Sequence, residues 1–279
     1  MQYAPSIRLN DGTDIPQLGL GVWQLDDEEA RQSLLHAFET GYRHVDTAMI
    51  YGNEVGVGRA IAESGLARDD IYVTTKLWNA DQGYDAALRA FDESLARLGL
   101  EYLDLYLIHW PLPRNDNYVD SWRALIRLRD EGRIRSVGVS NFNMGHLQRL
   151  ADETGIAPAV NQIELHPDFM QKELVKFCVA KGIAVEAWSP LGQGGTLIEN
   201  PLLVAIGAAH GKTTAQVILR WHVQHAYIAN PRSRNPARIA ANFDVFDFSL
   251  TSLEMAAIDA LDSGNRLGPD PEQLHATRL

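Results

Sequence analysis

The chain has 279 residues, of which 46% are hydrophobic and 22% are charged, an ordinary globular composition that excludes a disordered or collagen-like protein. The net charge of -11 disfavours nonspecific binding to nucleic acid or anionic lipid, so neither is expected as a partner. Cys178 is the only cysteine, which excludes an intramolecular disulfide and a multi-thiolate zinc site. Because we find no signal-peptide pattern and no apolar run of about 18 residues, we expect a cytoplasmic protein without a membrane span.

The first element in chain order is a small hairpin. Residues 7–16 contain Asp11-Gly12, a dipeptide typical of tight hairpin turns. After it, short apolar runs alternate with stretches of helical spacing. The runs are rich in β-branched and aromatic residues, as buried strands are, and they cover residues 18–22, 44–47, 71–77, 103–110, 134–139, 159–165, 184–188 and 227–231.

The stretches between these runs carry apolar stripes typical of amphipathic helices. The first follows the acidic residues 26–29, carries Leu34 and Phe38, and stops at Gly41. Later stripes end in the same way, at Gly99, Gly132 and Gly182. Eight strand–helix units without a Pro-, Gly- or Ser-rich linker predict an α/β fold, a (β/α)₈ TIM barrel, with residues 1–279 as one domain. A doubly wound open sheet is the alternative, but it usually has about five or six units and a glycine fingerprint after its first strand.

Both ends of the chain fit this architecture. The N-terminal hairpin would plug the floor of the barrel. The segment after Asp262 has no hydrophobic periodicity, so we expect it to lie loosely over one end of the barrel as a C-terminal loop.

Four polar side chains should meet at one rim of this barrel, because function in TIM barrels lies at the carboxyl ends of the strands. Asp46, Lys76 and His109 end three consecutive strands, and Tyr51 follows in the loop after the first of them. Taken singly, Asp46 could be a turn former, Tyr51 a packing residue and His109 a satisfied core histidine. Lys76 is harder to dismiss, since an unpaired amine at the end of an apolar strand is costly. Their coincidence at one rim favours function.

The chemistry that this group offers is proton donation to a carbonyl. A free tyrosine has a pKa of about 10, and a nearby lysine cation lowers that value, whereas desolvation raises it. We expect Lys76 to prevail over desolvation at Tyr51, with Asp46 holding the lysine charged and His109 donating a hydrogen bond to the carbonyl oxygen. Neither a nucleophile nor a pair of catalytic carboxylates is evident. The other reactant should therefore come from a cofactor that carries hydride.

Two segments late in the chain suit such a cofactor. The stretch Ser189-Pro-Leu-Gly-Gln-Gly-Gly offers backbone amides for a pyrophosphate. Three arginines and a serine at one helix start predict a site for a 2′-phosphate, although a solvated helix start is the plain alternative; they are Arg232, Ser233, Arg234 and Arg238. Trp188 could stack on a nicotinamide ring. The carboxamide of that nicotinamide could bind the polar groups of Ser140, Asn141 and Gln162.

The substrate should meet an apolar wall at the same rim. Trp23, Trp78 and Trp110 each follow a strand there. A metal-dependent barrel hydrolase is a rival interpretation, because His44 and Asp46 lie two residues apart on one strand. It would need further ligands from other strands, which the sequence does not offer, so we expect no metal.

Several motifs resemble the aldo-keto reductase family, and bacterial 2,5-diketo-D-gluconate reductase-like members in particular. They are Gly41-Tyr-Arg-His-Val-Asp-Thr-Ala, Tyr51-Gly-Asn-Glu, Thr75-Lys-Leu-Trp, Leu103-Asp-Leu-Tyr-Leu-Ile-His-Trp-Pro, Gly138-Val-Ser-Asn-Phe, Asn161-Gln-Ile-Glu-Leu-His-Pro and Asn242-Phe-Asp-Val-Phe-Asp-Phe. The resemblance implies NADPH as cofactor and the tetrad Asp46, Tyr51, Lys76 and His109, with Tyr51 as proton donor.

The resemblance also implies positions for the cofactor. It places the nicotinamide on Ser140, Asn141, Gln162 and Trp188. It places the pyrophosphate on Ser189, Leu191, Gly192 and Gln193. It places the adenosine phosphate on Arg232, Ser233, Arg234, Arg238 and Asn242. Family members often have lysine where this chain has Arg232, and arginine keeps that positive charge.

The expected function is NADPH-dependent reduction of aldehydes or ketones to alcohols by a monomer, with 2,5-diketo-D-gluconate or a related dicarbonyl as the candidate substrate. His109 would then contact the carbonyl substrate beside Trp23, Trp78 and Trp110. A second class of function is open to the same fold, namely a cofactor-binding accessory or sensor subunit. The metal-dependent hydrolase is the third.

Overall fold

The computed structural model describes residues 4–274 and contains one closed barrel of parallel strands. Neighbouring strands pair in chain order. The seam between the last strand and the first is closed by two parallel bridges, from Leu18 to Ala229 and from Gly21 to Arg232. The eight strands are β3 (Leu20–Gly21), β4 (His44–Asp46), β5 (Tyr72–Leu77), β6 (Leu103–Ile108), β7 (Ile134–Ser140), β8 (Val160–Glu164), β9 (Ala184–Trp188) and β10 (Ile228–Ala229). The predicted (β/α)₈ barrel is confirmed, with each strand inside its predicted run or within one residue of it.

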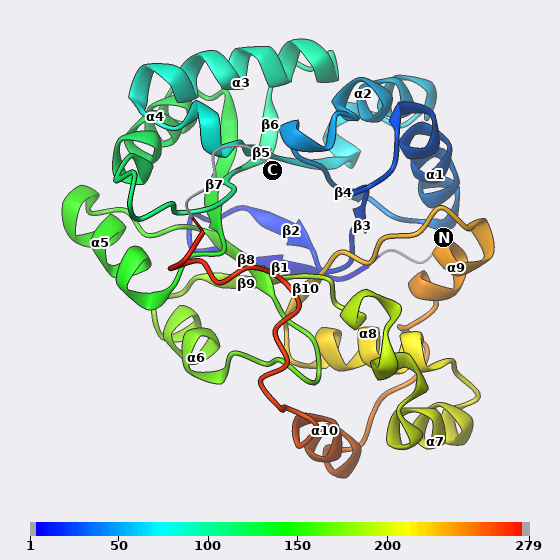
Figure 1. The fold of residues 1–279 in the computed structure, drawn as a ribbon. Coiled ribbons are helices and arrows are strands. Elements are labelled where there is room, and N and C mark those ends of the chain that lie inside the picture. Colours follow the sequence, from blue (N-terminus) through cyan, green and yellow to red (C-terminus); the bar gives the residue numbers. More distant parts are fainter. Residues whose placement is uncertain (1–3, 275–279) are drawn as a thin grey trace.

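The helices form a ring outside the strands (Figure 1). The first helix starts at a capping box on Asp26, and its C-cap is Gly41 with a positive φ of 124°, where the sequence predicted its end. Gly99 and Gly182, also with positive φ, follow two other helices as predicted. The helices are α1 (Asp27–Thr40), α2 (Glu54–Glu63), α3 (Tyr84–Leu98), α4 (Tyr118–Asp130), α5 (Met144–Thr154), α6 (Lys172–Ala180), α7 (Pro201–His210), α8 (Thr214–Gln224), α9 (Pro236–Phe243) and α10 (Ser252–Asp259).

An N-terminal hairpin plugs the floor of the barrel, as predicted. Strands β1 (Ser6–Arg8) and β2 (Asp14–Pro16) pair antiparallel. Ile15 of this hairpin is fully buried in an apolar cluster with barrel residues such as Leu105, and the hydroxyl of Thr13 lies 2.7 Å from that of Ser136. The hairpin therefore seals the end of the barrel opposite the functional rim.

Strand side chains alternate between two environments. Outward residues such as Val45 and Val185 join the large core between strands and helices. Inward residues near the floor are apolar, and those above them are polar and buried. The barrel interior therefore changes from hydrocarbon at the floor to a layer of charged and amide side chains below the rim, and such groups need partners there.

The C-terminal tail is not loose, contrary to the sequence-based expectation. The backbone amides of Ser263 and Asn265 donate to the carbonyl of Asp168. The amides of Leu267 and Gly268 donate to the two carboxylate oxygens of Glu164, at 2.6 and 2.9 Å. The tail therefore crosses the rim as an anchored strap, because its backbone donors find buried acceptors that hydrophobic periodicity does not reveal.

Candidate active site

The carboxyl ends of β4, β5 and β6 bring the four predicted side chains to one rim. Asp46 ends β4 and Lys76 is the penultimate residue of β5. His109 follows β6 directly, and Tyr51 ends η1, the 3₁₀ helix Met49–Tyr51 between β4 and α2. The parallel register brings these neighbouring strand ends side by side. The four residues therefore share one site, as the sequence predicted.

Lys76 is the centre of this group. Its side chain is fully buried, and its ammonium donates to Asp46 Oδ1 at 2.7 Å and to the carbonyl of Thr47 at 2.9 Å. The Asp46 carboxylate helps to raise the pKa of Lys76 although burial alone would lower it. Lys76 is therefore a fixed cation inside the barrel. It is held by one ion pair and one backbone carbonyl.

Tyr51 lies against this cation, with its ring centroid 5.2 Å from Lys76 Nζ. Burial raises the pKa of Tyr51 above its usual value, while Lys76 opposes that effect through its charge and a hydrogen bond. The expectation that the cation would prevail is therefore wrong. Desolvation is the larger effect on the pKa of Tyr51. Tyr51 consequently stays protonated at neutral pH, which is the form that a proton donor needs.

His109 faces Tyr51 across the site, with ring centroids 6.0 Å apart. Burial and the Lys76 charge lower its pKa well below the usual value, so the imidazole is neutral near pH 7. A neutral imidazole can donate one hydrogen bond to a carbonyl oxygen without carrying charge into the site. Its ring packs edge-on against Trp78, with centroids 5.2 Å apart.

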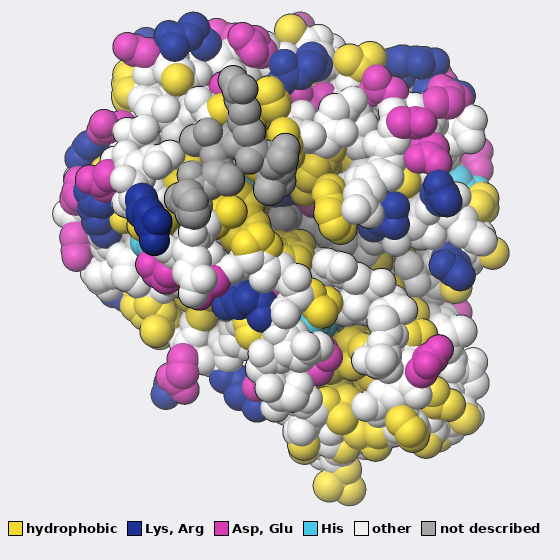
Figure 2. Space-filling model, viewed as in Figure 1, with side chains coloured by type: hydrophobic (Ala, Val, Ile, Leu, Met, Phe, Trp, Pro, Cys, Tyr) yellow, Lys and Arg dark blue, Asp and Glu magenta, His cyan; other side chains and the backbone are white. Residues whose placement is uncertain are grey.

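An apolar wall adjoins His109. Trp78, Trp110 and Leu112 form a buried cluster, and the side chains packed against it are Met49, Trp188 and Leu274. Hydrophobic side chains gather around the hollow in the middle of this face, with most charged groups nearer its edge (Figure 2). Trp23, predicted for the same wall, is 43% exposed and is not one of the side chains of this cluster. Leu112 and the tail residue Leu274 were missed, because neither stands at a strand end.

The residues predicted for a nicotinamide lie together beside the tetrad, already engaged with one another. Trp188 Nε1 donates to Asn141 Oδ1 at 2.8 Å, and Asn141 Nδ2 donates to the carbonyl of His109 at 3.0 Å. Ser140 Oγ donates to the carbonyl of Gln162, whose Nε2 donates to Asp46 Oδ1 at 3.0 Å. Gln162 therefore faces the tetrad carboxylate, a contact that the sequence did not predict.

The loop after β9 has the backbone shape expected of an anion-binding turn. Four residues of this loop have a positive φ. Two of them, Ser189 and Gln193, are not glycine, and the other two are Gly192 and Gly194, which flank Gln193. Leu191 lies in the same loop and packs partly buried on the main core. Such reversals of backbone direction turn successive amides to one side, as pyrophosphate sites require.

The predicted arginines gather where α9 begins. Arg232, Arg234 and Arg238 are exposed, whereas Ser233 and Asn242 are buried. Arg234 forms a 2.8 Å ion pair with Glu29 of α1, a partner that the sequence did not suggest. Several guanidinium groups and a hydroxyl at a helix start are the chemistry that binds a phosphate monoester. Together with the loop after β9 and Trp188, these residues fit a dinucleotide phosphate with its nicotinamide at Tyr51.

The tail contributes to the site through a contact that the sequence did not show. A Cβ added to Gly268 would lie 2.4 Å from Cη2 of Trp188 and 3.0 Å from Glu164 Oε2. Only glycine therefore fits between the β8 carboxylate and the indole. The strap thus packs closely against the six-membered ring of the Trp188 indole.

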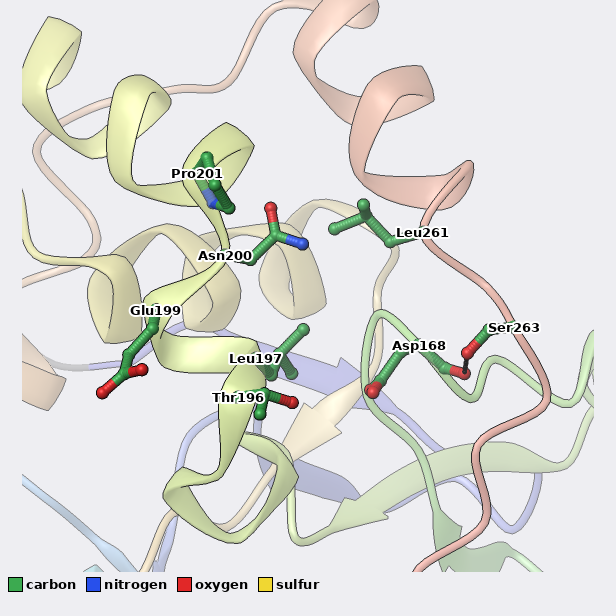
Figure 3. A pocket seen from close by; sticks show the side chains of 8 residues that line it. All are labelled: Asp168, Thr196, Leu197, Glu199, Asn200, Pro201, Leu261 and Ser263. Atoms are coloured by element: carbon green, nitrogen blue, oxygen red, sulfur yellow. Dashed lines mark hydrogen bonds between the residues drawn. The ribbon is translucent and has the colours of Figure 1, made fainter.

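A cavity of about 460 Å³ lies beside the site rather than in it. It separates the segment Thr196–Pro201, after the β9 loop, from Asp168 and from Ser263 at the start of the tail (Figure 3). Ser263 Oγ donates to the Asp168 carbonyl across its edge. None of the four tetrad residues lines it.

The metal-dependent alternative has no ligand set in residues 4–274. Among them, no three His, Cys, Asp or Glu side chains are grouped as a metal site needs. His44 lies inside the barrel with its Nε2 3.2 Å from the hydroxyl of Thr74. As for a membrane, no single helix of the described residues is long and apolar enough to cross one, and only α7 and α8, bent by 87°, pass as a pair by length and composition.

Known proteins resemble the whole chain. The model of the Aldo/keto reductase family matches residues 17–263. An aldo-keto reductase of Mycolicibacterium smegmatis is 57% identical over 274 residues, covering 98% of this chain and 99% of that protein. Methylglyoxal reductase DkgA of Yersinia pestis is 50% identical over 279 residues, covering 100% of both. A mutant of Gox0644 in complex with NADPH superposes with a TM-score of 0.94 at 45% identity, covering 98% of this chain and 99% of that one.

The fold and the similarity to known proteins agree. The barrel with its hairpin plug is confirmed, and the family match includes every strand of the barrel. The resemblance of the sequence motifs to this family, and to its bacterial 2,5-diketo-D-gluconate reductase-like members, is confirmed as well. This chain is a member of the aldo/keto reductase family.

Proposed function

We propose that this protein reduces small aldehydes and ketones to alcohols with NADPH, and that Tyr51 donates the proton. The observation that carries the proposal is the position of the Lys76 ammonium, which is fixed by Asp46 and Thr47 directly against the Tyr51 ring. A buried cation beside a protonated phenol stabilises the phenolate that forms when the proton leaves. No other role for this costly buried charge is evident at the rim.

The protein residues divide the work of the reaction. When bound, NADPH supplies hydride to the carbonyl carbon. His109 orients the carbonyl oxygen toward Tyr51 through its neutral imidazole. Tyr51 transfers its hydroxyl proton to that oxygen, and Lys76 stabilises the resulting phenolate. Asp46 keeps Lys76 charged, and the wall of Trp78, Trp110 and Leu112 excludes water from the reacting atoms.

The cofactor assignment follows the chemistry of the donors. We infer that Ser140, Asn141 and Gln162 hold the carboxamide and that Trp188 lies against the ring. The pyrophosphate is assigned to the loop residues Ser189, Leu191, Gly192 and Gln193. The adenosine phosphate is assigned to the start of α9 and to Asn242 in its last turn, with Arg232, Ser233, Arg234 and Arg238 as its partners. The NADPH in the Gox0644 complex supports NADPH as the cofactor.

The substrate class that we favour is a small dicarbonyl, such as methylglyoxal or 2,5-diketo-D-gluconate. The related Yersinia pestis protein is named a methylglyoxal reductase. The described wall is compact and aromatic, and His109 is the polar side chain that packs among its indoles. A small aldehyde with an adjacent carbonyl suits such a wall. The second carbonyl activates the reacting one, so the substrate does not need a long apolar group to react.

A substrate panel tests this function. Purified enzyme is mixed with NADPH and with methylglyoxal, a keto-sugar acid, an aromatic aldehyde or a ketosteroid, and nicotinamide absorbance is followed. We expect steady turnover, with the highest kcat/KM for a dicarbonyl. Binding of NADPH without turnover on any carbonyl would favour the accessory or sensor subunit. A reaction that a chelator abolishes would favour the metal-dependent hydrolase. Sedimentation of the same sample tests the proposed monomer.

Replacing Arg238 by alanine should weaken NADPH binding far more than NADH binding. We assign the exposed guanidinium at the start of α9 to the phosphate that distinguishes the two cofactors, so a loss of about tenfold to a hundredfold is expected for NADPH alone. The Kd of each cofactor is measured by quenching of tryptophan fluorescence. Lys212, a cation that pairs with Asp244 and has no assigned cofactor contact, provides the matched control as Lys212→Ala. Equal losses for both cofactors would remove the 2′-phosphate assignment.

A further inference from the structure

A second carboxyl group lies buried in the barrel below the tetrad. Glu186 is at the middle of β9, and its side chain has no exposed surface. Its neighbours Val185 and Ala187 point outward into the helix-facing core, so the alternation of the strand directs Glu186 into the barrel. A buried carboxylate is expensive unless a cation pairs with it.

Glu186 has no such cation. Asn230 Nδ2, a neutral donor, binds Glu186 Oε1, while Oε2 has no hydrogen-bond partner in the described part of the chain. Lys76, which could have paired with it, is bound to Asp46. His44 Nε2 lies 3.7 Å from Oε1, but burial lowers the pKa of His44 to about 4, so that ring is neutral near pH 7.

Glu186 nevertheless adjoins the tetrad. Its register partner on β8 is Gln162, whose Nε2 donates to Asp46. Gln162 thus lies between the two carboxyl groups. The titratable groups that face Glu186 come from three elements: His44 and Asp46 of β4, Tyr72 and Lys76 of β5, and Tyr51 of η1.

The charge balance depends on the protonation of Glu186. Burial, followed by repulsion from Asp46, raises the pKa of Glu186 to about 8. Near pH 7 Glu186 is therefore neutral, and the partner of the Lys76 ammonium is Asp46. Above pH 8 a second negative charge appears, and that charge favours the protonated form of Tyr51.

We propose that Glu186 is a positioning residue for proton transfer: its buried carboxyl, which Asn230 binds and which Gln162 separates from Asp46, sets how much negative charge faces Lys76 and Tyr51. The inference rests on the proposed function, because it acts through Tyr51 as the donor. It assigns Glu186 no contact with substrate or cofactor. The consequence is that reduction persists to a higher pH than the tetrad alone would allow.

The test is the pH profile of Glu186→Gln, whose amide resembles the neutral carboxyl at every pH. Below pH 7, kcat/KM for reduction should stay within about twofold of the wild type. The alkaline limb should move to lower pH, since no second charge opposes ionisation of Tyr51. The rise of alcohol oxidation with pH, which needs the phenolate, should move down by the same amount.

Glu54→Gln is the matched control. Glu54 is also buried, but it points to the outside of the barrel, where it binds Thr75 and Arg97. The same chemical change there should leave both alkaline limbs in place. A limb that moves equally in both variants would contradict the proposal.

Stability provides a readout independent of activity. The pKa of Glu186 is raised from 4.5 to about 8 on folding, so its stabilising contribution is complete below pH 4.5 and is lost as the pH rises through 8. Glu186→Gln should therefore gain in Tm relative to the wild type between about pH 5 and 8, with the difference constant above that range. A difference in Tm between the two proteins that does not change with pH would contradict the claim that the Glu186 carboxyl is protonated near pH 7.

A second variant keeps the proposal testable should Glu186→Gln fail to fold. Asn230→Ala removes one of the hydrogen bonds that favour the ionised carboxyl, so the pKa of Glu186 rises further and the alkaline limb should again move to lower pH. If the alkaline limbs of Glu186→Gln and Asn230→Ala stay at the wild-type pH while Tyr51→Phe abolishes reduction, the inference fails and the proposed function stands. If Tyr51→Phe reduces carbonyls normally, the proposed function itself fails.

Discussion

Tyr51→Phe should slow carbonyl reduction by about two to four orders of magnitude and leave NADPH affinity within about twofold. The substitution removes one hydroxyl and keeps the ring that packs over Lys76 Nζ and against His109. Since Tyr51 is the only phenol of the four residues at this rim, no neighbouring acid replaces its proton at the same position. The measurement is kcat/KM with the best dicarbonyl, together with the NADPH Kd from fluorescence.

The matched control for this variant is Tyr118→Phe. Tyr118 begins α4 and is buried there, and its hydroxyl lies 3.3 Å from Arg149 at the outside of the barrel. Loss of that hydroxyl should leave kcat/KM near the wild-type value. Near-normal turnover in Tyr51→Phe would show that the proton comes from elsewhere.

Lys76→Met should have the second largest effect, on both stability and activity. It leaves the Asp46 carboxylate, which is 7% exposed, without its cation, and breaking one partner of a buried pair costs about 3–5 kcal/mol. It also removes the charge that stabilises the Tyr51 phenolate, so kcat should fall by at least about a hundredfold. Denaturant unfolding and steady-state kinetics measure the two effects.

A double variant separates these two effects. Asp46→Asn with Lys76→Met removes both charges, so the unpaired carboxylate disappears and most of the lost stability should return. Activity should remain low, because the phenolate still has no cation beside it. Recovery of activity together with stability would mean that Lys76 serves folding only.

Most of the barrel could be predicted because each strand carries its own signal. The run 103–110 is apolar and includes all of β6, since both of its faces are buried. The runs 18–22 and 227–231 exceed β3 and β10, which have two residues each. These two strands are shorter than their apolar runs because the seam between them closes through isolated bridges rather than a continuous ladder.

The tetrad could also be predicted, since strand ends of a parallel barrel share one rim. The protonation of Tyr51 could not, because it depends on the balance between desolvation and the Lys76 charge, and that balance is set by packing. The Arg234–Glu29 pair was likewise hidden, as its partners lie 205 positions apart. The anchored tail gave no signal, because its contacts run from backbone amides to Glu164.

Glu186 is a missed residue whose signal was present. It is a charged side chain inside an apolar strand, the same pattern that singled out Lys76. The strand-end rule directed attention to Trp188 instead, two residues further on. Charged residues in the middle of barrel strands therefore merit the same scrutiny as those at strand ends.

The most direct test of Tyr51 as proton donor is a single turnover of enzyme-bound NADPH with methylglyoxal, followed by nicotinamide absorbance in ordinary and in deuterated water. If Tyr51 transfers its proton as hydride arrives, the wild-type reaction is slower in deuterated water, and Tyr51→Phe is slow in both with that difference lost. An equal solvent effect in the two proteins would contradict this account, since the proton would then come from a group that the substitution leaves untouched.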